Sequence, residues 1–466
     1  MLLPDGAASA SASSLDLDGR ERHSASGLSD EALLEYDYAP QEIVFTVQDG
    51  NKVKGGTLRA LVERLTLHDA LDPSFTTCFL LTYRSFTSTP ALFRLLVSRF
   101  QIAPPAGLTR AQAEVWRARK QTPIRIRVFH VLKSWLEQYC LDEPDDLAVL
   151  SEIRDFADQA MRAAGMEAAA NALIRIVEQR QVLPGVFRRA VQATPQPLPA
   201  PILPRNLRKF RLTDLDPLEL ARQLTLMESA EYNKITPQEF LNKNWSNKRP
   251  GASPNIKTMS RLSNQIIGWV ALTILAEKDP KRRAPVVKHL ILVGDRCRML
   301  NNFNTLMSIL AGLNSAPIHR LKRTFELLSA RVQAILDVLR DTMAPHRNFS
   351  TYRDTLHAVT PPCVPFLGFY LTDLTFIEDG NPDFLKGGEL INFGKRLKTS
   401  DVIREVQQYQ TTPYAVAPVP EIQQWLLQQF DQSTDDNALY EMSLLLEPRE
   451  RDDEKITRLL QESGFL

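Results

Sequence analysis

The sequence has few cysteines and no long hydrophobic run. Its four cysteines, Cys78, Cys140, Cys297 and Cys363, lie far apart and match no zinc or redox spacing. We therefore expect reduced, mostly buried thiols, as in proteins of a reducing compartment. The longest uncharged apolar stretch, Ser263–Ala276, is shorter than the roughly 20 residues that span a bilayer. The sequence thus argues against a disulfide-stapled scaffold and predicts no transmembrane segment.

An excess of charge of one sign is also missing. The chain carries 56 Lys and Arg against 55 Asp and Glu, which gives a net charge of +1. Binding nucleic acid or an anionic membrane by electrostatics requires a basic excess. We therefore expect no nucleic-acid partner. The opening MLLPDGAASASASS lacks the basic and long apolar segments of a signal peptide, so the sequence predicts a cytoplasmic protein.

Signatures of covalent and cofactor chemistry are absent as well. The sequence contains no Walker-type phosphate loop, no GxGxxG, no HExxH and no GxSxG motif. The seven histidines are scattered, and none pairs with another His or a Cys at metal-ligand spacing. The residues alone therefore predict a helical protein without a cofactor, a metal site or a visible catalytic dyad.

Helical patterns fill most of the chain. Thr57 is a predicted N-cap for an amphipathic helix that begins at Leu58, and Asp216 and Pro217 form a second helix-start signal. Residues 42–47, EIVFTV, alternate like a short strand. We predict an all-α fold with minor β structure near the N-terminus. Helices are expected, among other places, at 124–138, 168–180, 257–278, 285–300, 325–343, 365–379, 390–410 and 421–430.

Composition divides the chain into two helical units. Residues 193–204, ATPQPLPAPILP, contain five prolines, which fix φ and remove donors, so they predict an extended linker. The expected organisation is a disordered lead at 1–35, an N-terminal domain at 36–190, a proline-rich linker at 191–212, a second domain at 213–450 and a C-terminal tail or helix at 451–466.

Residues 361–382, PPCVPFLGFYLTDLTFIEDGNP, predict a helix with an unusual end. The helix should stop at Gly380 as a C′ residue, with Glu378 and Asp379 in its last turn. That end is the negative pole of the helix dipole, so each acid there costs about 0.3–1 kcal/mol. The acids are either solvated surface residues or carboxylates held out to a cationic partner. A second helical pattern at 390–410 follows, so the two segments predict an αα-hairpin.

The same segment carries a family resemblance. The blocks PPCVPFLGxYLTDL, GNPxxL and LINFxKR between 361 and 396 resemble the catalytic domain of Ras guanine-nucleotide exchange factors. Further blocks in family order are DPxELARQLTLxE at 216–228, LNNFNTL at 300–306, LNSAPIHRLKRTF at 313–325 and LYEMSLLLEPR at 439–449. VKGGTLRALVERLT at 53–66 and FLLTYRSFT at 79–87 resemble the Ras exchanger motif that precedes that domain. The resemblance covers roughly residues 36–450, and the chain is similar to the C-terminal part of fungal cell-division-control Ras exchangers.

The resemblance implies a helical bowl with a protruding hairpin. In this family the hairpin wedges between the switch regions of a GDP-bound Ras-family GTPase, obstructs its magnesium site and rearranges its phosphate loop, so that GDP leaves and GTP replaces it. Exchanger and nucleotide weaken each other's binding equally, and no covalent bond changes. The implied function is therefore regulatory rather than enzymatic, at the membrane where Ras is anchored. Exchange on Rap, or GTPase binding without exchange, remains the alternative.

Matching the motifs position by position implies the site residues. Thr375 and Asp379 match two hairpin positions aimed at the magnesium and phosphate region of the GTPase. Thr375 is smaller than the apolar residue of some members, and Asp379 is one methylene shorter than the Glu of several members. Five further positions are implied to bind the GTPase: Arg222, Thr225, Asn314, Leu371 and Phe366.

Each of these positions also has a structural alternative. Arg222 is otherwise a solvated helix residue, Thr225 a residue bonded back to its own helix, Asn314 a helix C-cap and Phe366 a packing residue. The N-terminal unit is expected to pack against the hairpin and hold it upright, so that loss of 36–190 lowers exchange more than it lowers the stability of the second domain.

Overall fold

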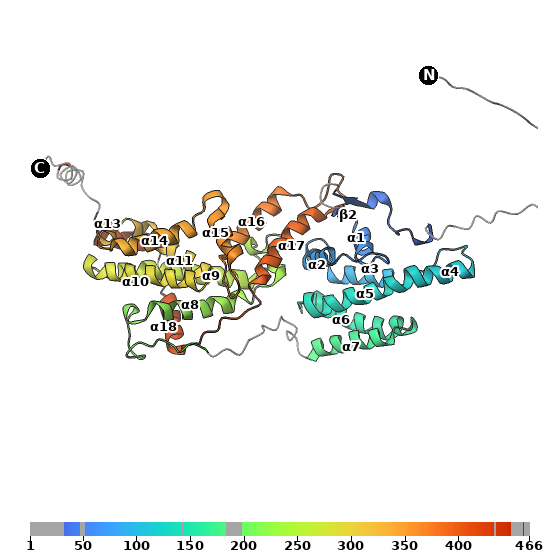
Figure 1. Ribbon diagram of the computed structural model, residues 1–466, viewed down its shortest axis with the longest axis horizontal. Helices are drawn as coiled ribbons and strands as arrows, with labels where there is room; N and C mark the ends of the chain where they lie inside the picture. Colours follow the sequence, from blue (N-terminus) through green and yellow to red (C-terminus); the bar gives the residue numbers. More distant parts are fainter. Residues whose placement is uncertain are drawn as a thin grey trace, which may run out of the picture.

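The computed structural model describes residues 32–46, 52–141, 143–182, 198–432, 435–448 and 460. Two helical units lie end to end (Figure 1), an N-terminal unit at 32–182 and a second unit at 198–448. Strands contribute one small sheet, so the predicted all-α class with minor β structure is confirmed. No described helix is long and apolar enough to cross a membrane.

The N-terminal unit is a stack of seven α-helices in its described residues. They are α1 (Leu58–Leu65), α2 (Pro73–Thr82), α3 (Thr89–Phe100), α4 (Arg110–Trp116), α5 (Thr122–Ser134), α6 (Pro144–Phe156) and α7 (Glu167–Val182). Helix α1 begins where the sequence signal lies, because the Thr57 hydroxyl accepts a hydrogen bond from the Ala60 N–H at 3.2 Å. The apolar faces of six of these helices, all except α4, share one core.

The second unit is larger and has a core of its own. Its helices are α8 (Pro217–Tyr232), α9 (Pro254–Leu275), α10 (Pro280–Met299), α11 (Phe303–Asn314), α12 (Ala316–His319), α13 (Lys322–Phe325), α14 (Ala330–Thr342), α15 (His346–Ala358), α16 (Leu367–Gly380), α17 (Phe393–Gln408), α18 (Pro420–Phe430) and α19 (Asp436–Leu446). Helix α8 starts as its signal predicted, since Asp216 accepts a hydrogen bond from the Leu218 N–H at 2.8 Å.

The prediction of a single helix at 325–343 is wrong. Helix α13 ends at Phe325 and α14 begins at Ala330, because Ser329 has an extended backbone (φ −66°, ψ 151°) that interrupts the helix. We predicted no helix over α15, although Phe349, Tyr352 and Leu356 lie at the i, i+3, i+7 spacing of one helix face. Three consecutive residues at its start, 347–349, have left-handed backbone angles, so regular right-handed helix begins only after them.

The expected lead and tail fall largely outside the described residues, whereas 198–212 of the expected linker lie inside them. At the end of the lead, Ala32–Leu34 form a 3-10 turn in which Leu33 is buried, so order begins earlier than residue 36. In the linker, residues 198–204 form neither helix nor strand, and Leu212–Asp214 form a 3-10 turn. Burial of Leu33 and Leu212 explains the order at both places.

The sheet joins the two units. Strands β1 (Ile43–Phe45) and β2 (Val53–Gly56) pair antiparallel, and β2 also pairs antiparallel with β3 (Ile391–Asn392) from the second unit. The helix expected at 390–410 therefore begins only at Phe393, after this strand. Gly55 is required by the close approach, because a Cβ there would lie 2.7 Å from the Ile391 carbonyl oxygen and 2.6 Å from Leu385 Cδ1.

Each unit also contributes apolar side chains to the core of the other. Leu81 of α2 belongs to the core of the second unit, while Ile391 and Phe393 belong to the core of the N-terminal unit. The Phe393 and Phe75 ring centroids are 4.7 Å apart. The predicted packing of the N-terminal unit against the second helix of the hairpin is therefore present, with α17 beside α2 (Figure 1).

All four cysteines are free and buried, as expected. Burial raises the pKa of the Cys78 thiol to about 12 and also raises the pKa of Cys297 and Cys363. These thiols stay protonated at neutral pH, and a protonated thiol is a poor nucleophile or metal ligand.

Candidate functional site

Helices α16 and α17 pack against each other and form the predicted hairpin, near the junction of the two units (Figure 1). The first turn of α16 is anchored to the second unit by two hydrogen bonds. The Phe366 N–H donates to the Tyr352 hydroxyl at 2.8 Å, and the Leu367 N–H donates to Asn304 Oδ1 at 3.3 Å. The direction in which the hairpin leaves the body is therefore fixed at its base.

The far end of α16 differs from the glycine cap that the sequence predicts. The helix runs through Gly380, and Asn381 is the C-cap in an extended conformation (φ −134°). The Asn381 side-chain amide donates to the Ile377 carbonyl at 2.9 Å and so satisfies one carbonyl of the last turn. Because the Asn381 amide caps the helix in this way, a glycine with left-handed backbone angles is not needed to end it.

Glu378 is not a solvated surface acid. Its carboxylate lies 2.6 Å from Lys395 Nζ, and the Lys395 side chain is only 2% exposed. The same ammonium lies 2.9 Å from Asp383, which also pairs with Arg396 at 2.7 Å. Partial burial acts to raise the pKa of Asp383, but the hydrogen bonds from Lys395 and Arg396 outweigh it and lower that pKa. This cluster locks α16 to α17.

Asp379 is the exposed acid of the pair. Its side chain is 63% exposed and forms an ion pair with Lys243, which lies in the loop between α8 and α9. Each acid at the negative end of α16 thus has a lysine partner that offsets the unfavourable dipole. Asp379 is the one of the two whose carboxylate faces solvent.

Two more predicted residues lie in the same row of α16 as Asp379. Thr375 is half-buried and its hydroxyl donates to the Leu371 carbonyl at 2.7 Å. Leu371 is also half-buried and packs against the core of the second unit. The spacing of four residues places the three on one side of the helix. The structure therefore brings Leu371, Thr375 and Asp379 together.

The two predicted residues of α8 are less accessible. Arg222 pairs with the buried Glu219 at 3.1 Å, and its side chain is 13% exposed. Thr225 is 1% exposed, donates to the Ala221 carbonyl at 2.7 Å and accepts from Asn302 at 3.0 Å. In this conformation the Thr225 side chain is packed into the unit, and its contact with a GTPase stays a prediction. The alternative of a bond back to its own helix holds.

Comparison with protein families accounts for this arrangement. Residues 52–156 match the model of the RasGEF N-terminal motif, and residues 219–397 match the RasGEF domain. The chain belongs to the RasGEF family. The domain match contains α16 and the first turn of α17, and the motif match contains β2 and α2, which the hairpin contacts.

Several RasGEF relatives are similar over most of this chain. It is 39% identical over 408 residues to cell division control protein 25 of Candida albicans, which covers 86% of this chain and 30% of that protein. It is 34% identical over 450 residues to Ras guanine nucleotide exchange factor Y of Dictyostelium discoideum (87% and 30%). It is 33% identical over 430 residues to protein son of sevenless of Drosophila melanogaster (85% and 27%). The chain spans less than a third of each of these proteins.

A polar network that the sequence did not reveal lies beneath the RasGEF hairpin. Glu228 of α8 is fully buried and accepts hydrogen bonds from Asn304 Nδ2 at 2.8 Å and Thr305 Oγ1 at 2.5 Å. Burial raises the pKa of Glu228 to about 7, although these hydrogen bonds act to lower it. Asn304 also accepts from Leu367 N, so the network connects α8 and α11 to the first turn of α16. The polar residues within the LNNFNTL block were the available signal.

The remaining predicted RasGEF residues lie apart. Asn314 is exposed at the end of α11, and its side-chain oxygen accepts from Arg340 at 2.8 Å. Phe366 is half-buried at the base of α16, where its ring lies 6.0 Å from that of Phe349. Both leave part of their side chain accessible to a partner, and their contacts with Arg340 and Phe349 lie away from the acidic end of the hairpin.

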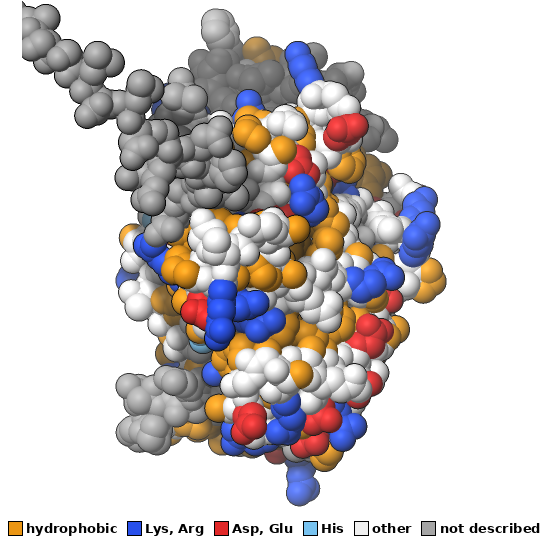
Figure 2. All heavy atoms as spheres, turned by 90° about the vertical axis from the view of Figure 1, so that its right-hand side faces the viewer, with side chains coloured by type: hydrophobic (Ala, Val, Ile, Leu, Met, Phe, Trp, Pro, Cys, Tyr) orange, Lys and Arg blue, Asp and Glu red, His pale blue; other side chains and the backbone are white. Residues whose placement is uncertain are grey.

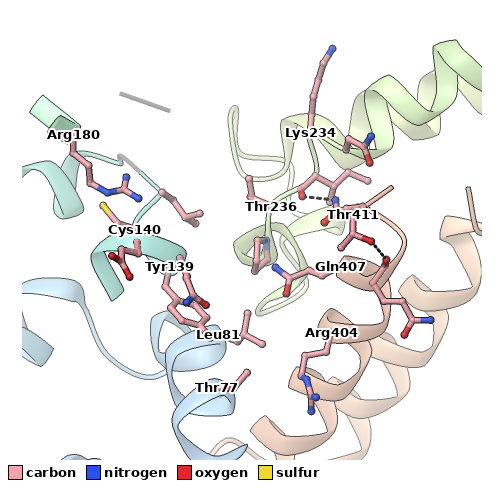
Figure 3. Close-up of a pocket in the computed structure, with 18 residues that line it drawn as sticks. Thr77, Leu81, Tyr139, Cys140, Arg180, Lys234, Thr236, Arg404, Gln407 and Thr411 are labelled. Carbon is pink, nitrogen blue, oxygen red and sulfur yellow. Dashed lines mark hydrogen bonds between the residues drawn. The ribbon is translucent and has the colours of Figure 1, made fainter. Parts of the chain in front are cut away.

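A cavity of about 630 Å³ lies between the RasGEF motif and the RasGEF domain (Figure 3). Tyr139 and Cys140 line it from one side, and Thr236 and Gln407 line it from the other. The ends of Lys234 and Arg404 extend away from its centre in Figure 3. Among the described residues, no group of three or more His, Cys, Asp or Glu side chains is placed to hold a metal. The hairpin therefore remains the strongest candidate site.

Proposed function

We propose that this chain promotes GDP release from a Ras-type GTPase by inserting the α16–α17 hairpin between the switch regions, so that GTP can load. The observation that carries the proposal is the exposed carboxylate of Asp379 at the end of a helix whose base and tip are both fixed. Ras guanine nucleotide exchange factor Y of Dictyostelium discoideum, named for exchange on Ras, is similar over 87% of this chain.

The chemistry of a phosphate site explains why a carboxylate serves here. Phosphate loops bind nucleotide through backbone N–H groups and a lysine, which are left without their anion when the nucleotide departs. A carboxylate that reaches these groups stabilises the empty GTPase and so weakens nucleotide binding by linkage. In this proposal Asp379 supplies the carboxylate, and Thr375, one turn earlier, approaches the magnesium region.

Leu371 and Phe366 contribute apolar contact with the GTPase, and Arg222 and Asn314 contribute polar contact at the edges of the interface. Thr225 supports the surface from within, since it is buried. No bond forms or breaks in the exchanger, so the chain acts as a regulator rather than an enzyme and uses no cofactor or metal of its own. Its partners are the GDP-bound and the nucleotide-free GTPase.

The surface charge is consistent with a protein partner. On the face in Figure 2, Lys and Arg side chains alternate with Asp, Glu, apolar and neutral ones, without one extended basic area. A nucleic-acid site requires such an area. We propose a cytoplasmic protein that reaches membrane-anchored Ras through other partners.

Release of fluorescent GDP from purified Ras, Rap and Ral proteins tests the proposal. The chain should accelerate release, and Asp379→Ala should lower the rate about 10-fold or more, because a hydrogen bond to a charged group contributes about 1.5–3 kcal/mol. Asp401→Ala removes an exposed acid of α17 whose ion pair, with Arg404 at 3.9 Å, is long, and should leave the rate unchanged.

The same assay separates the alternatives. Acceleration with Rap but not with Ras would assign Rap as the substrate. Complex formation without acceleration, and indifference to Asp379→Ala, would identify a GTPase-binding scaffold. Absence of both binding and acceleration with all three GTPases would refute the proposal.

A further inference from the structure

The two acids at the end of α16 have counter-ions of different kinds. Lys395, the partner of Glu378, is 2% exposed and also bonds Asp383, so it cannot leave without exposing a cluster of charges. Lys243, the partner of Asp379, is 33% exposed and, among the described residues, forms an ion pair with that acid alone. Lys395 is therefore a fixed counter-ion of Glu378, whereas Lys243 can be replaced by another cation at Asp379.

The loop that carries Lys243 is shaped to present it. Asn242 and Lys243 both have left-handed backbone angles (φ 51° and 53°), a conformation that non-glycine residues adopt at a cost and that persists only where surrounding contacts enforce it. Those contacts are present. The Ser253 hydroxyl donates to the Asn244 carbonyl at 3.0 Å, and Lys257 Nζ donates to the Asn247 carbonyl at 2.6 Å. The loop thus holds the lysine opposite the end of α16.

The pair stands beside open space. A cavity of about 530 Å³ borders it and is open enough to admit groups of another protein. Among the residues that line it are Ser85, Lys243, Glu378, Asp379, Asp383 and Lys395. A cation of a partner can therefore approach Asp379 without a rearrangement of α16.

We infer that Lys243 is a resident counter-ion for Asp379, which a cationic group of the GTPase displaces when the hairpin engages. This inference rests on the proposed function. It makes Lys243 a positioning residue, because it acts on the GTPase only through Asp379. Before the complex forms, Lys243 neutralises the carboxylate at the negative end of the helix. During engagement, one cation replaces another at the same oxygen atoms.

The exchange of counter-ions predicts the direction in which Lys243 variants change the rate of nucleotide release. An ion pair between exposed side chains is weak, equivalent to a factor of roughly 1.5 to 5 in an equilibrium constant. Breaking it opposes engagement by that factor, and the nearby ammonium also repels an incoming cation. Removal of the Lys243 charge should therefore speed nucleotide release, while a variant that keeps the charge should not.

The test is GDP release from the GTPase on which the parent chain is most active, measured at low exchanger concentration and low salt. Lys243→Gln should raise kcat/KM roughly 1.5- to 5-fold, and Lys243→Arg should stay near the parent. The gain should disappear in an Asp379→Ala background and shrink as salt rises, because salt screens exposed charges. Lys398→Gln is the matched control, since Lys398 bonds Asn381 on the same hairpin at 3.1 Å.

The outcomes separate this inference from the function on which it rests. If the parent chain is active and sensitive to Asp379→Ala but Lys243→Gln is unchanged or slower, the displaced counter-ion is refuted and the exchange function stands. A gain that persists without Asp379, or that Lys398→Gln reproduces, would show a general charge effect and would also refute it. An inactive parent chain would overturn the proposed function and this inference with it.

Discussion

Glu228 is the residue with the clearest consequence for pH dependence. It is fully buried, and burial raises its pKa to about 7 from an ordinary value of 4.5. The unfolded chain therefore loses this proton at a lower pH than the folded chain does. The contribution of Glu228 to the free energy of unfolding is therefore fully present below pH 4.5, falls as the pH rises toward 7 and is absent above that range.

Replacement by glutamine tests this assignment. Glu228→Gln removes the titrating group and keeps one of the two side-chain oxygens, which accept separately from Asn304 and Thr305. Relative to this variant, the wild-type free energy of unfolding should fall by up to about 3 kcal/mol between pH 4.5 and 7. Chemical denaturation at several pH values measures it. The exposed Glu114→Gln should show no such change relative to wild type, and a constant difference for Glu228→Gln would contradict the assignment.

Sequence reasoning at the residue scale identified Asp379 but not its partner. The acid was visible because it breaks the helix-dipole rule, which is local. Lys243 lies in a loop far away in the sequence, so nothing local connects it to α16. For Thr225, sequence reasoning identified the position but not its burial. The motif marks its position, but only the packing of Asn302 against it shows that it is buried.

At the scale of elements, the contact between β2 and β3 depends on Gly55. Gly55→Ala places a Cβ against the Ile391 carbonyl and Leu385, where backbone must shift. Such overpacking costs about 1–3 kcal/mol. We expect a lower free energy of unfolding, and faster hydrogen exchange at the Ile391 amide of β3.

Gly268→Ala is the matched control for this change. A Cβ at Gly268 meets nothing within 4 Å, and the residue lies inside α9. The substitution should be neutral or stabilise by up to about 1 kcal/mol, because alanine favours helix over glycine. A Gly55→Ala protein as stable as wild type, with a protected Ile391 amide, would show that this contact is unimportant.

The elements themselves differ in how far the sequence predicts them. Helices such as α8, α9 and α18 have a full apolar period and a start signal, so their existence could be predicted. Strand β3 could not, because two residues show no period and its partner lies in the other unit. Helix α15 was not predicted, although Phe349, Tyr352 and Leu356 have helical spacing, and its left-handed start at 347–349 could not be predicted from that spacing.

At the scale of the whole molecule, the two units are joined through the hairpin. Ile391 and Phe393 follow its turn and are buried in the core of the N-terminal unit, and β3 extends the N-terminal sheet. The Gln238 side chain of the second unit also donates to Glu143 of the first at 2.7 Å. These contacts support the expectation that the N-terminal unit holds the hairpin in place.

Phe393→Ala tests that support in the intact chain. The side chain is fully buried, so its loss should cost about 3–5 kcal/mol. If the N-terminal unit orients the hairpin, GDP release per folded molecule should also fall several-fold, because the hairpin samples orientations that do not fit the GTPase. Phe430→Ala is the control, since Phe430 is buried against Trp269 in the second unit and should cost similar stability without slowing release.

The fragment 206–466 is the more drastic form of the same experiment. It retains Thr375, Asp379 and Lys243 but lacks every N-terminal partner of Phe393, so it should release GDP more slowly than the whole chain while its helices persist by circular dichroism. A slow fragment together with a slow Phe393→Ala protein assigns the effect to hairpin orientation, because the point variant keeps the N-terminal unit. Equal activity of the fragment and the whole chain would show that the hairpin stands without support, and the shared core would then serve stability alone.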